Sequence, residues 1–452
     1  MNALTLPLSL KNANSVEQYG AALDSLKRFV TENNKDDAFI LSGSAGTGKT
    51  SLLKEFTEFL DENNIDFKLL APTGQAAKVV ARRTGKVAGT LHSAVYTINE
   101  EGKDEIVRYE FLPRINRLIR PCVFIVDEAS MISDLPANNE LFVSKNSVLY
   151  DFLQFYKKSP NGSKVVFVGD SFQLPPVMEA VSGALSEEYL YKKHHINSKG
   201  FQLTEVFRQK SNSSIYNNAL ILKKLITKKL QYMPDLQFRQ MYRADLAINR
   251  FCEIFNPKNE DYAIFLGWKN STIDKLNNVI RNKLFQNPSE ILHPNEQIIL
   301  GRSYYKDHYL PSGTIGKVIS YNPYSVENIA ETKFAEATLR FEMAGGDVIT
   351  ISSKVNLDFL LNGSTDEDPK RIKKLWADRK KTNKLFRETN NPADDPYLSA
   401  FKIKYGYAIT THKAQGGEWQ NVFLYPEFPK DENRLKWIYT AVTRASEELY
   451  SF

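Results

Sequence analysis

The sequence predicts an α/β protein with two lobes, each built around a parallel sheet. Short apolar runs alternate with helical stretches over the first 205 residues, and the same alternation returns near the end of the chain. A glycine-rich loop follows the first apolar run. Because 452 residues exceed what one core usually holds, more than one domain is expected.

The first lobe is predicted from four apolar runs that read as buried strands. They are residues 38–41, 68–71, 123–126 and 164–168. Helical patterns lie between them, and in 50–60 five apolar residues share one helix face. These are Leu52, Leu53, Phe56, Phe59 and Leu60. Parallel strands joined by helices form a doubly wound sheet.

A second lobe is predicted from three later runs, 263–268, 407–410 and 421–425. Between the first two of these, residues 286–400 are richer in Pro, Gly, Asn and charge, and their extended stretches predict a mostly β insertion. A smaller insertion, 93–121, has two extended arms around Glu-Gly-Lys and predicts a hairpin.

Composition limits the class of protein. The net charge of +6 favours a polyanionic partner only mildly. No apolar run approaches the ~20 residues of a membrane helix, and the first residues lack the features of a signal peptide. Two distant cysteines, Cys122 and Cys252, favour a reducing compartment, and we expect a cytoplasmic protein with no membrane partner.

The glycine-rich loop GSAGTGKT predicts a site for nucleotide phosphates. It lies between a strand and a helix, where backbone N–H groups can surround phosphate oxygens. Lys49 would reach the β- and γ-phosphates, and Thr50 would bind Mg²⁺. The alternative is a turn without a ligand. The loop residues are Gly43, Ser44, Ala45, Gly46, Thr47, Gly48, Lys49 and Thr50.

Two carboxylates follow the third apolar run, in VFIVDEAS (123–130). Ligands bind at the carboxyl ends of parallel strands, so we expect both beside the phosphates. Asp127 would hold Mg²⁺, and Glu128 would orient and deprotonate the attacking water. The alternative is an ordinary helix start with acidic residues. Together with the loop, the pair predicts hydrolysis of a nucleoside triphosphate.

Five segments resemble consecutive motifs of superfamily 1 helicases, in the RecD-like branch that includes phage Dda and the Pif family. They are DEASM (127–131), GDSFQLPPV (169–177), LTEVFRQ (203–209), YAITTHKAQGGEWQNVFL (407–424) and YTAVTRA (439–445). The resemblance implies two RecA-like P-loop lobes. It divides the chain into a first lobe (1–92, 122–205), a pin hairpin (93–121), a second lobe (206–285, 401–452) and an SH3-like β subdomain (286–400).

The resemblance also implies roles around the nucleotide. Gln173 would sense the γ-phosphate and link it to the DNA groove. Arg208 and Arg444 would stabilise charge on the transferring phosphoryl group. Gln18 would read the adenine edge, and Gly417 and Glu418 would meet the nucleotide, Glu418 at the ribose.

Contacts with the DNA backbone are implied for residues of both lobes, so binding should be salt-sensitive and nearly independent of sequence. These residues are Pro72, Thr73, Thr90, His92, Thr410, Thr411, His412 and Lys413. In the hairpin, Tyr96, Tyr109 and Phe111 could stack on a base during strand separation, or form the hairpin's own small core. Residues 370–387 predict a packed helix with a basic face.

The function implied is an ATP- and Mg²⁺-dependent DNA helicase. It would act as a monomer on single-stranded DNA and single-strand/duplex junctions, moving 5′→3′, alongside replication, recombination or repair proteins. The main rival is a translocase or remodelling ATPase that strips proteins without efficient unwinding. A nucleotide switch without turnover and a P-loop kinase remain further alternatives.

Overall fold

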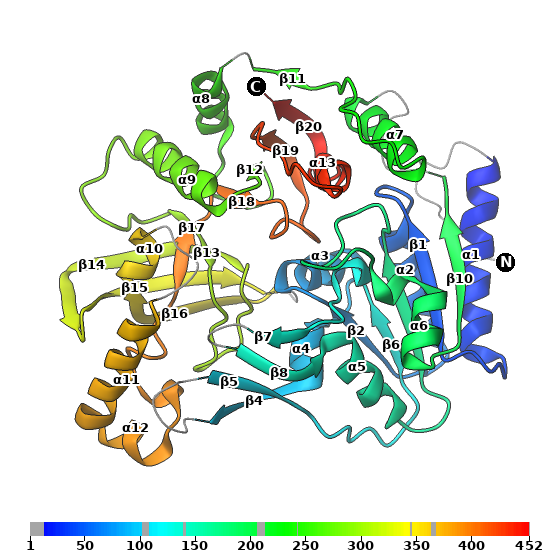
Figure 1. Ribbon diagram of the computed structural model, residues 1–452, viewed down its shortest axis with the longest axis horizontal. Coiled ribbons are helices and arrows are strands. Elements are labelled where there is room, and N and C mark those ends of the chain that lie inside the picture. The colour runs from blue at the N-terminus through cyan, green and yellow to red at the C-terminus, as the bar shows by residue number, and fades with distance from the viewer. Residues whose placement is uncertain are drawn as a thin grey trace.

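The computed structural model contains two parallel sheets, a long antiparallel sheet and a small mixed sheet (Figure 1). The two parallel sheets belong to the two predicted lobes, which meet at the centre of the molecule near α3 (Gly74–Thr84). The residues described are 13–101, 108–138, 142–205, 213–241, 243–343, 346–362 and 368–451.

The first lobe has a six-stranded parallel sheet with the order β10-β1-β9-β6-β2-β3. Its four central strands are the four apolar runs, which confirms the prediction. They are buried on both faces, as parallel strands require. The strands are β1 (Ala38–Gly43), β2 (Phe67–Ala71), β3 (Ala88–Thr90), β6 (Val123–Val126), β9 (Lys164–Gly169) and β10 (Ser198–Leu203).

Helices cover both faces of this sheet. Along β1, Phe39 and Leu41 pack toward α1 and α2, whereas Ile40 packs toward α5 and α6. Of the five apolar residues predicted to share one face of α2, four are buried and Phe59 is partly buried. The helical segments are α1 (Ala13–Thr31), α2 (Lys49–Glu62), α3, α4 (Leu91–Val95), η1 (Ala129–Met131), α5 (Val148–Lys157), η2 (Gly183–Leu185) and α6 (Glu187–His194).

The hairpin insertion is present but is not isolated. β4 (Tyr96–Glu101) and β5 (Arg108–Pro113) pair in antiparallel fashion. β5 also pairs in parallel with β8 (Phe142–Ser147), which pairs with β7 (Pro136–Asn138). The sequence analysis did not find the last two strands, because they are short and polar and exist only through this distant pairing.

The second lobe has a five-stranded parallel sheet with the order β11-β20-β19-β12-β18. Its three adjacent strands β19, β12 and β18 are the three later apolar runs. The strands are β11 (Arg239–Gln240), β12 (Ala263–Gly267), β18 (Ala408–Thr410), β19 (Trp419–Leu424) and β20 (Ala445–Ser451). The helices are α7 (Ser214–Thr227), α8 (Ala244–Ile254), α9 (Asn270–Leu284) and α13 (Arg434–Val442).

The second insertion is an antiparallel sheet with the order β16-β15-β14-β13-β17, as predicted for a mostly β segment. Helices α10 (Leu357–Leu361), α11 (Pro369–Thr382), α12 (Lys384–Thr389) and η3 (Pro392–Asp394) follow its long strands. Leu375 and Trp376 of α11 are buried with Phe334 and Phe386, so the packed-helix interpretation is confirmed. The strands are β13 (Gln297–Leu300), β14 (Ile315–Ile329), β15 (Thr332–Glu342), β16 (Val348–Asn356) and β17 (Ile403–Tyr405).

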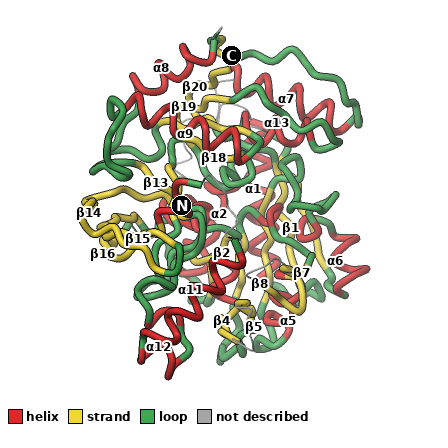
Figure 2. The backbone as a smooth tube through the Cα atoms, turned by 60° about the vertical axis from the view of Figure 1, so that its left-hand side comes forward, coloured by secondary structure: helices red, strands yellow, loops and turns green. Residues whose placement is uncertain are grey.

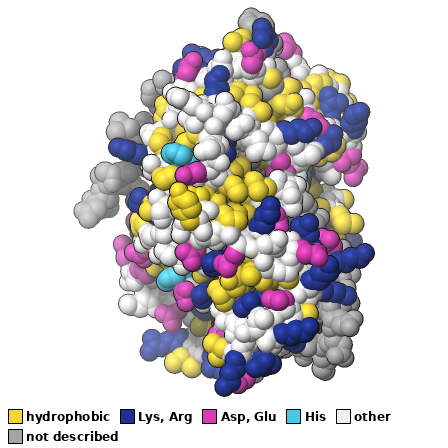
Figure 3. All heavy atoms as spheres, turned by 90° about the vertical axis from the view of Figure 1, so that its left-hand side faces the viewer, with side chains coloured by type: hydrophobic (Ala, Val, Ile, Leu, Met, Phe, Trp, Pro, Cys, Tyr) yellow, Lys and Arg dark blue, Asp and Glu magenta, His cyan; other side chains and the backbone are white. Residues whose placement is uncertain are grey.

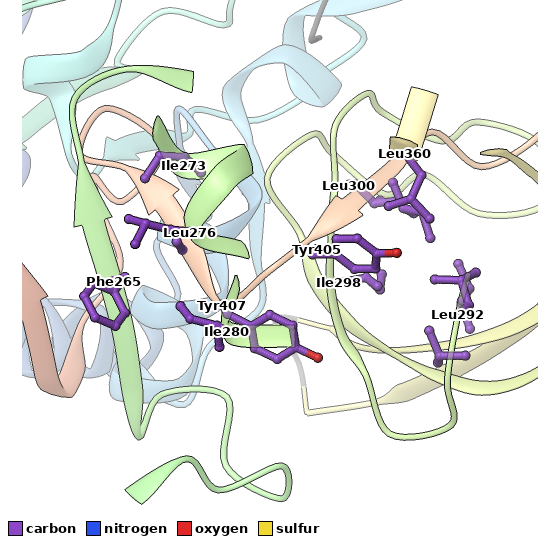
Figure 4. Packing of buried hydrophobic residues seen from close by; sticks show 14 of the residues in the cluster. Phe265, Ile273, Leu276, Ile280, Leu292, Ile298, Leu300, Leu360, Tyr405 and Tyr407 are labelled. Atoms are coloured by element: carbon purple, nitrogen blue, oxygen red, sulfur yellow. The ribbon is translucent and has the colours of Figure 1, made fainter. Parts of the chain in front are cut away.

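The insertion shares its core with the second lobe. Strand β17 lies beyond residue 400 and pairs with β13, and the chain then enters β18 of the parallel sheet. Figure 4 shows the cluster extending from Phe265 and Ile280 through Tyr407 to Ile298 and Leu360. One continuous core therefore holds the antiparallel sheet against α9 and β12.

The exterior is mixed in charge. On the face of the antiparallel sheet, Lys and Arg are interspersed with Asp and Glu, and basic side chains gather at the lower end (Figure 3). α11 and α12 lie at that end (Figure 2). Within the described ranges, every helix is too short or too polar to cross a lipid bilayer.

Candidate active site

The phosphate loop connects β1 to α2 in a conformation that needs glycine. Gly46 and Gly48 have φ values of +81° and +83°, which side chains disfavour. At Gly43, an added Cβ would lie 2.5 Å from Thr47 Oγ1. The loop therefore keeps its backbone N–H groups close to the N-terminus of α2, where the helix dipole favours anions.

Lys49 is held over this loop. Its Nζ donates hydrogen bonds to the carbonyl oxygens of Gly43, at 2.7 Å, and Ser44, at 3.1 Å. Both Lys49 and Thr50 line a cavity of about 340 Å³. An ammonium at the mouth of a loop rich in N–H donors is suited to bind phosphate oxygens.

The two carboxylates emerge from the end of β6 beside Lys49. Asp127 is buried, and its Oδ1 accepts a hydrogen bond from Glu128 N at 2.9 Å. Burial, with the nearby charge of Glu128, raises the pKa of Asp127 to about 7, while Lys49 and Arg83 act in the opposite direction. Glu128 has φ +53°, and its Oε2 is buried without a hydrogen-bond partner. Such an oxygen is suited to accept a proton from a bound water.

Gln173 reaches the same cavity from the turn after β9. Its side chain is buried, and its Oε1 has no hydrogen-bond partner. The turn is held from both sides. Gln173 N bonds to Asp170 O at 3.2 Å, while Leu174 bonds to Thr440 Oγ1 and Gln415 Nε2 of the second lobe, each at 3.0 Å. The amide is thus fixed between the lobes.

Arg444 brings the second lobe into the cavity. Its guanidinium donates to the carbonyls of Thr440 and Gly417, both at 3.1 Å, and to Thr443 Oγ1 at 3.4 Å. These partners are neutral and leave its charge available to a phosphate. Arg208, the other predicted arginine, lies outside the described residues.

Gly417 and Glu418 also line the cavity, as predicted. Glu418 Oε2 accepts a hydrogen bond from Arg83 Nη2 at 2.6 Å. Sequence reasoning missed Arg83, although it lines the cavity too. No local signal marks it, because Arg83 and Glu418 are 335 positions apart.

Gln18 is not among the residues that line the cavity. Its Nε2 donates to Thr204 Oγ1 at 2.9 Å, and its Oε1 accepts from the backbone N–H groups of Thr204 and Glu205. The side chain therefore ties α1 to the end of β10. Its adenine role stays a prediction.

Comparison with known proteins agrees with this two-lobed site. A family model described as an AAA domain matches residues 24–232, and one described as a UvrD-like helicase C-terminal domain matches residues 405–450. The ATP-dependent DNA helicase dda of phage T4 is 24% identical over 437 residues, covering 91% of this chain and 93% of that protein. Over most of its length the chain is therefore similar to ATP-dependent DNA helicases.

Two further helicases are similar to this chain. The ATP-dependent DNA helicase Pif1 of Campylobacter jejuni is 25% identical over 422 residues, covering 87% of this chain and 83% of that protein. The crystal structure of Pif1 helicase from Candida albicans has a TM-score of 0.50 and 19% identity, covering 96% of this chain and 93% of that one. The structural likeness shows the shared fold.

The predicted first-lobe DNA contacts lie where strands end. Thr73 caps α3 and accepts from Ala76 N, and Thr90 caps α4 and accepts from Ser93 N, each at 3.2 Å. Pro72 precedes the first cap, at the end of β2. Both threonine hydroxyls therefore also stabilise helix starts.

His92 is half-buried beside two aromatic rings. Its ring lies 5.8 Å from that of Tyr96 and 5.8 Å from that of Phe111. Burial lowers its pKa to about 4, so it is neutral at neutral pH. His92 thus packs against the aromatic rings of the small sheet, and its contact with the DNA backbone stays a prediction.

The predicted DNA contacts of the second lobe differ in how deeply they are buried. Thr410 and Thr411 are buried, and the Thr411 hydroxyl faces the carbonyl of Gly267 at 3.5 Å. Thr411 is fully enclosed, which corrects its predicted role as a DNA contact. His412 and Lys413 are half-buried, and burial lowers the pKa of both. These two remain candidates for phosphate contact.

The hairpin aromatics differ in the same way. Tyr96 is 3% exposed, and its hydroxyl donates to Asp151 Oδ2 at 2.9 Å. Its ring lies 5.3 Å from that of Phe111, which is half-buried. Of the two roles that the sequence left open for Tyr96, its burial favours the core role over stacking on a base. The side chain of Tyr109 lies outside the described residues.

Proposed function

We propose that this protein is an ATP-dependent DNA helicase that moves along single-stranded DNA and unwinds duplex. The observation that carries the proposal is the cavity between the lobes. Lys49, Asp127, Glu128 and Gln173 reach it from the first lobe, and Arg444 reaches it from the second. A site completed by two lobes makes hydrolysis depend on their closure, which a single-lobed kinase does not need.

Each residue has a defined task in hydrolysis. The loop N–H groups and Lys49 bind the β- and γ-phosphates, and Glu128 takes a proton from the attacking water. Arg444 stabilises negative charge on the transferring phosphoryl group, with Arg208 as its predicted partner. The amide nitrogen of Gln173 would donate a hydrogen bond to the γ-phosphate, and its buried, unpartnered amide oxygen could accept one from the attacking water.

Thr50 and Asp127 fit a magnesium site. Both line the cavity and offer oxygen donors, the ligands that Mg²⁺ prefers, and Asp127 is buried next to the phosphate loop. Bound there, Mg²⁺ would neutralise charge on the β- and γ-phosphates. A cation beside Asp127 would offset the burial that raises the pKa of this carboxyl, which supports the proposed magnesium site.

Movement follows if nucleotide occupancy changes the grip of each lobe on DNA. The turn that carries Gln173 is held by Thr440 and Gln415, so a shift of the second lobe also moves this turn. A stepping cycle needs only a difference in DNA affinity between the two states. The 5′→3′ direction rests on the family resemblance.

The same motor could serve as a translocase that strips proteins without efficient unwinding. One observation favours this second candidate: Tyr96 is buried, so the hairpin has fewer aromatics free to stack on a base. Phe111→Ala distinguishes the two, with Tyr96→Phe as the matched control. A helicase with an aromatic pin loses unwinding in the first variant while its ATP hydrolysis stays near the wild-type rate.

We further propose that the protein acts as a cytoplasmic monomer on single-strand/duplex junctions, with replication, recombination or repair proteins. Its contacts would follow the DNA backbone without reading bases, so its affinity should fall steeply with salt.

The direct test uses forked duplexes with a 5′ or a 3′ single-stranded tail, ATP and Mg²⁺. We expect unwinding of the 5′-tailed duplex only. Unwinding of the 3′-tailed duplex alone contradicts the direction. Single-strand-stimulated ATP hydrolysis without unwinding of either duplex supports the translocase, and hydrolysis that DNA does not stimulate contradicts both.

A further inference from the structure

The α3 helix carries three basic residues that reach acidic residues beyond the first lobe. Lys78 Nζ lies 2.9 Å from Glu260 Oε2 and 3.5 Å from Glu342 Oε2. Arg82 pairs with Asp261, and Arg83 pairs with Glu418 at 2.6 Å. α3 lies where the two lobes meet (Figure 1), so these pairs cross the surface at which the lobes close.

Arg83 differs from its neighbours because its pair lies in the nucleotide cavity. Arg83 and Glu418 both line it, together with Lys49 and Asp127. Arg82 and Asp261 are not among the lining residues. The Arg83 side chain is 30% exposed and that of Arg82 is 49% exposed. A bound nucleotide would therefore meet the first pair and not the second.

The loop that carries Glu418 is packed tightly on α3. Gly416 has φ +78°, and an added Cβ there would lie 2.5 Å from Ala76 Cβ. On its other side, the Gly417 carbonyl accepts a hydrogen bond from Arg444 at 3.1 Å. Arg83, the loop 416–418 and Arg444 are thus connected at the cavity wall. A displacement of Glu418 would therefore also displace α3.

The opposite end of α3 lies at the proposed DNA track. Thr73 caps the helix and follows Pro72. The helix has 11 residues and spans about 16 Å. Because a short helix behaves as a rigid unit, displacement of its C-terminal Arg83 is carried to its capping end.

We propose that Arg83 is a positioning residue that holds Glu418 at the nucleotide and, through α3, links nucleotide occupancy to the DNA-facing segment at Pro72 and Thr73. This inference rests on the proposed helicase function. The hydrogen bond from Arg83 sets the orientation of the Glu418 carboxylate before the sugar arrives. By thermodynamic linkage, bound nucleotide would change the affinity for DNA by the same factor by which bound DNA changes the affinity for nucleotide.

The test measures affinity for single-stranded DNA with and without a non-hydrolysable ATP analogue, for wild type, Arg83→Gln and the matched control Arg82→Gln. We expect the analogue to change DNA affinity in wild type and in Arg82→Gln, and the change to shrink by roughly 5-fold in Arg83→Gln. The KM for ATP should rise roughly 10-fold in Arg83→Gln, as for loss of one hydrogen bond between charged groups.

Two further variants test whether Arg83 orients Glu418 or only holds the two lobes together. Arg83→Lys should restore part of the effect, because an ammonium can still pair with Glu418. The double variant Arg83→Gln/Glu418→Gln should be little worse than Arg83→Gln alone, since the two residues act together.

Equal effects of Arg82→Gln and Arg83→Gln overturn the inference, as does a wild-type response in Arg83→Gln. A wild-type protein that binds DNA without any response to nucleotide, and does not hydrolyse ATP, overturns the proposed function itself. The two failures are therefore distinguishable.

Discussion

The hydroxyl of Tyr439 donates a hydrogen bond to Asp170 Oδ2 at 2.8 Å. The hydroxyl oxygen of Tyr439 also accepts a hydrogen bond from the backbone N–H of Ala45, at 3.1 Å. Tyr439 belongs to α13 of the second lobe, Asp170 follows β9, and Ala45 is in the phosphate loop. Burial and the charge of Asp170 raise the Tyr439 pKa well above its usual value, so the hydroxyl keeps its proton and remains a donor. One phenol thus joins the second lobe to two parts of the nucleotide site.

Tyr439→Phe should weaken this junction without opening a cavity. It leaves the Ala45 N–H and a buried Asp170 oxygen short of a partner, at a cost of about 1–3 kcal/mol in the free energy of unfolding. We expect single-strand-stimulated ATP hydrolysis to fall more than unstimulated hydrolysis. Tyr407→Phe, which removes a buried hydroxyl in the core away from the cavity, serves as the control in both thermal unfolding and ATPase assays.

Lys49→Ala should abolish turnover of ATP while the fold stays intact. Without the ammonium, the phosphates lose the cation that the loop holds over them, and we expect hydrolysis to fall by at least about 100-fold. The control is Lys54→Ala, on the same helix, because Lys54 is exposed and faces Glu58. Circular dichroism checks the fold, and stimulated turnover retained in Lys49→Ala would contradict the phosphate assignment.

Gln173→Ala should leave ATP and DNA binding largely intact while weakening the stimulation of ATP hydrolysis by DNA. The amide is buried between the lobes, and its loss removes the side chain proposed to connect the γ-phosphate with DNA grip. We expect ATP and DNA binding within a few-fold of wild type, and a DNA stimulation of hydrolysis reduced by about 10-fold. Ser171→Ala, in the exposed part of the same turn, should behave as wild type. Full stimulation in Gln173→Ala is the contrary result.

Acid should destabilise the protein through His92. Burial lowers its folded pKa to about 4, whereas an unfolded histidine titrates near ~6.5. Between these values the unfolded chain binds more protons, so the stability that His92 contributes is present above about pH 6.5 and is lost as pH falls toward 4. The loss should be on the order of 1–3 kcal/mol.

Unfolding by denaturant from pH 4 to 8 measures the effect. His92→Phe should flatten the profile in this window, and His308→Phe, which changes an exposed histidine, should leave it unchanged. If the free energy of unfolding changes equally with pH in wild type and in His92→Phe, the histidine ring is accessible to protons. That result would support His92 as a candidate for phosphate contact.

The sequence by itself determined the central strands of both parallel sheets and the residues that the first lobe contributes to the nucleotide site. Apolar runs such as 123–126 and 164–168 became the central strands, because burial on both faces requires uninterrupted apolar residues. Lys49, Asp127 and Glu128 could be placed in advance because each directly follows a strand or a glycine-rich turn, and such local geometry is written in neighbouring residues.

Only the tertiary structure decided which side chains face one another. Arg83 and Glu418 are 335 positions apart, and Tyr439 and Asp170 are 269 apart, so no local period marks either pair. Burial enclosed the Thr411 side chain, and it favoured the core role of Tyr96 over the stacking role that the sequence had left open. The short strands β7 and β8 pair with each other, and β8 also pairs with the distant β5. The physical reason is common to all: burial and pairing depend on what distant segments pack against a residue, and that is settled when the chain folds.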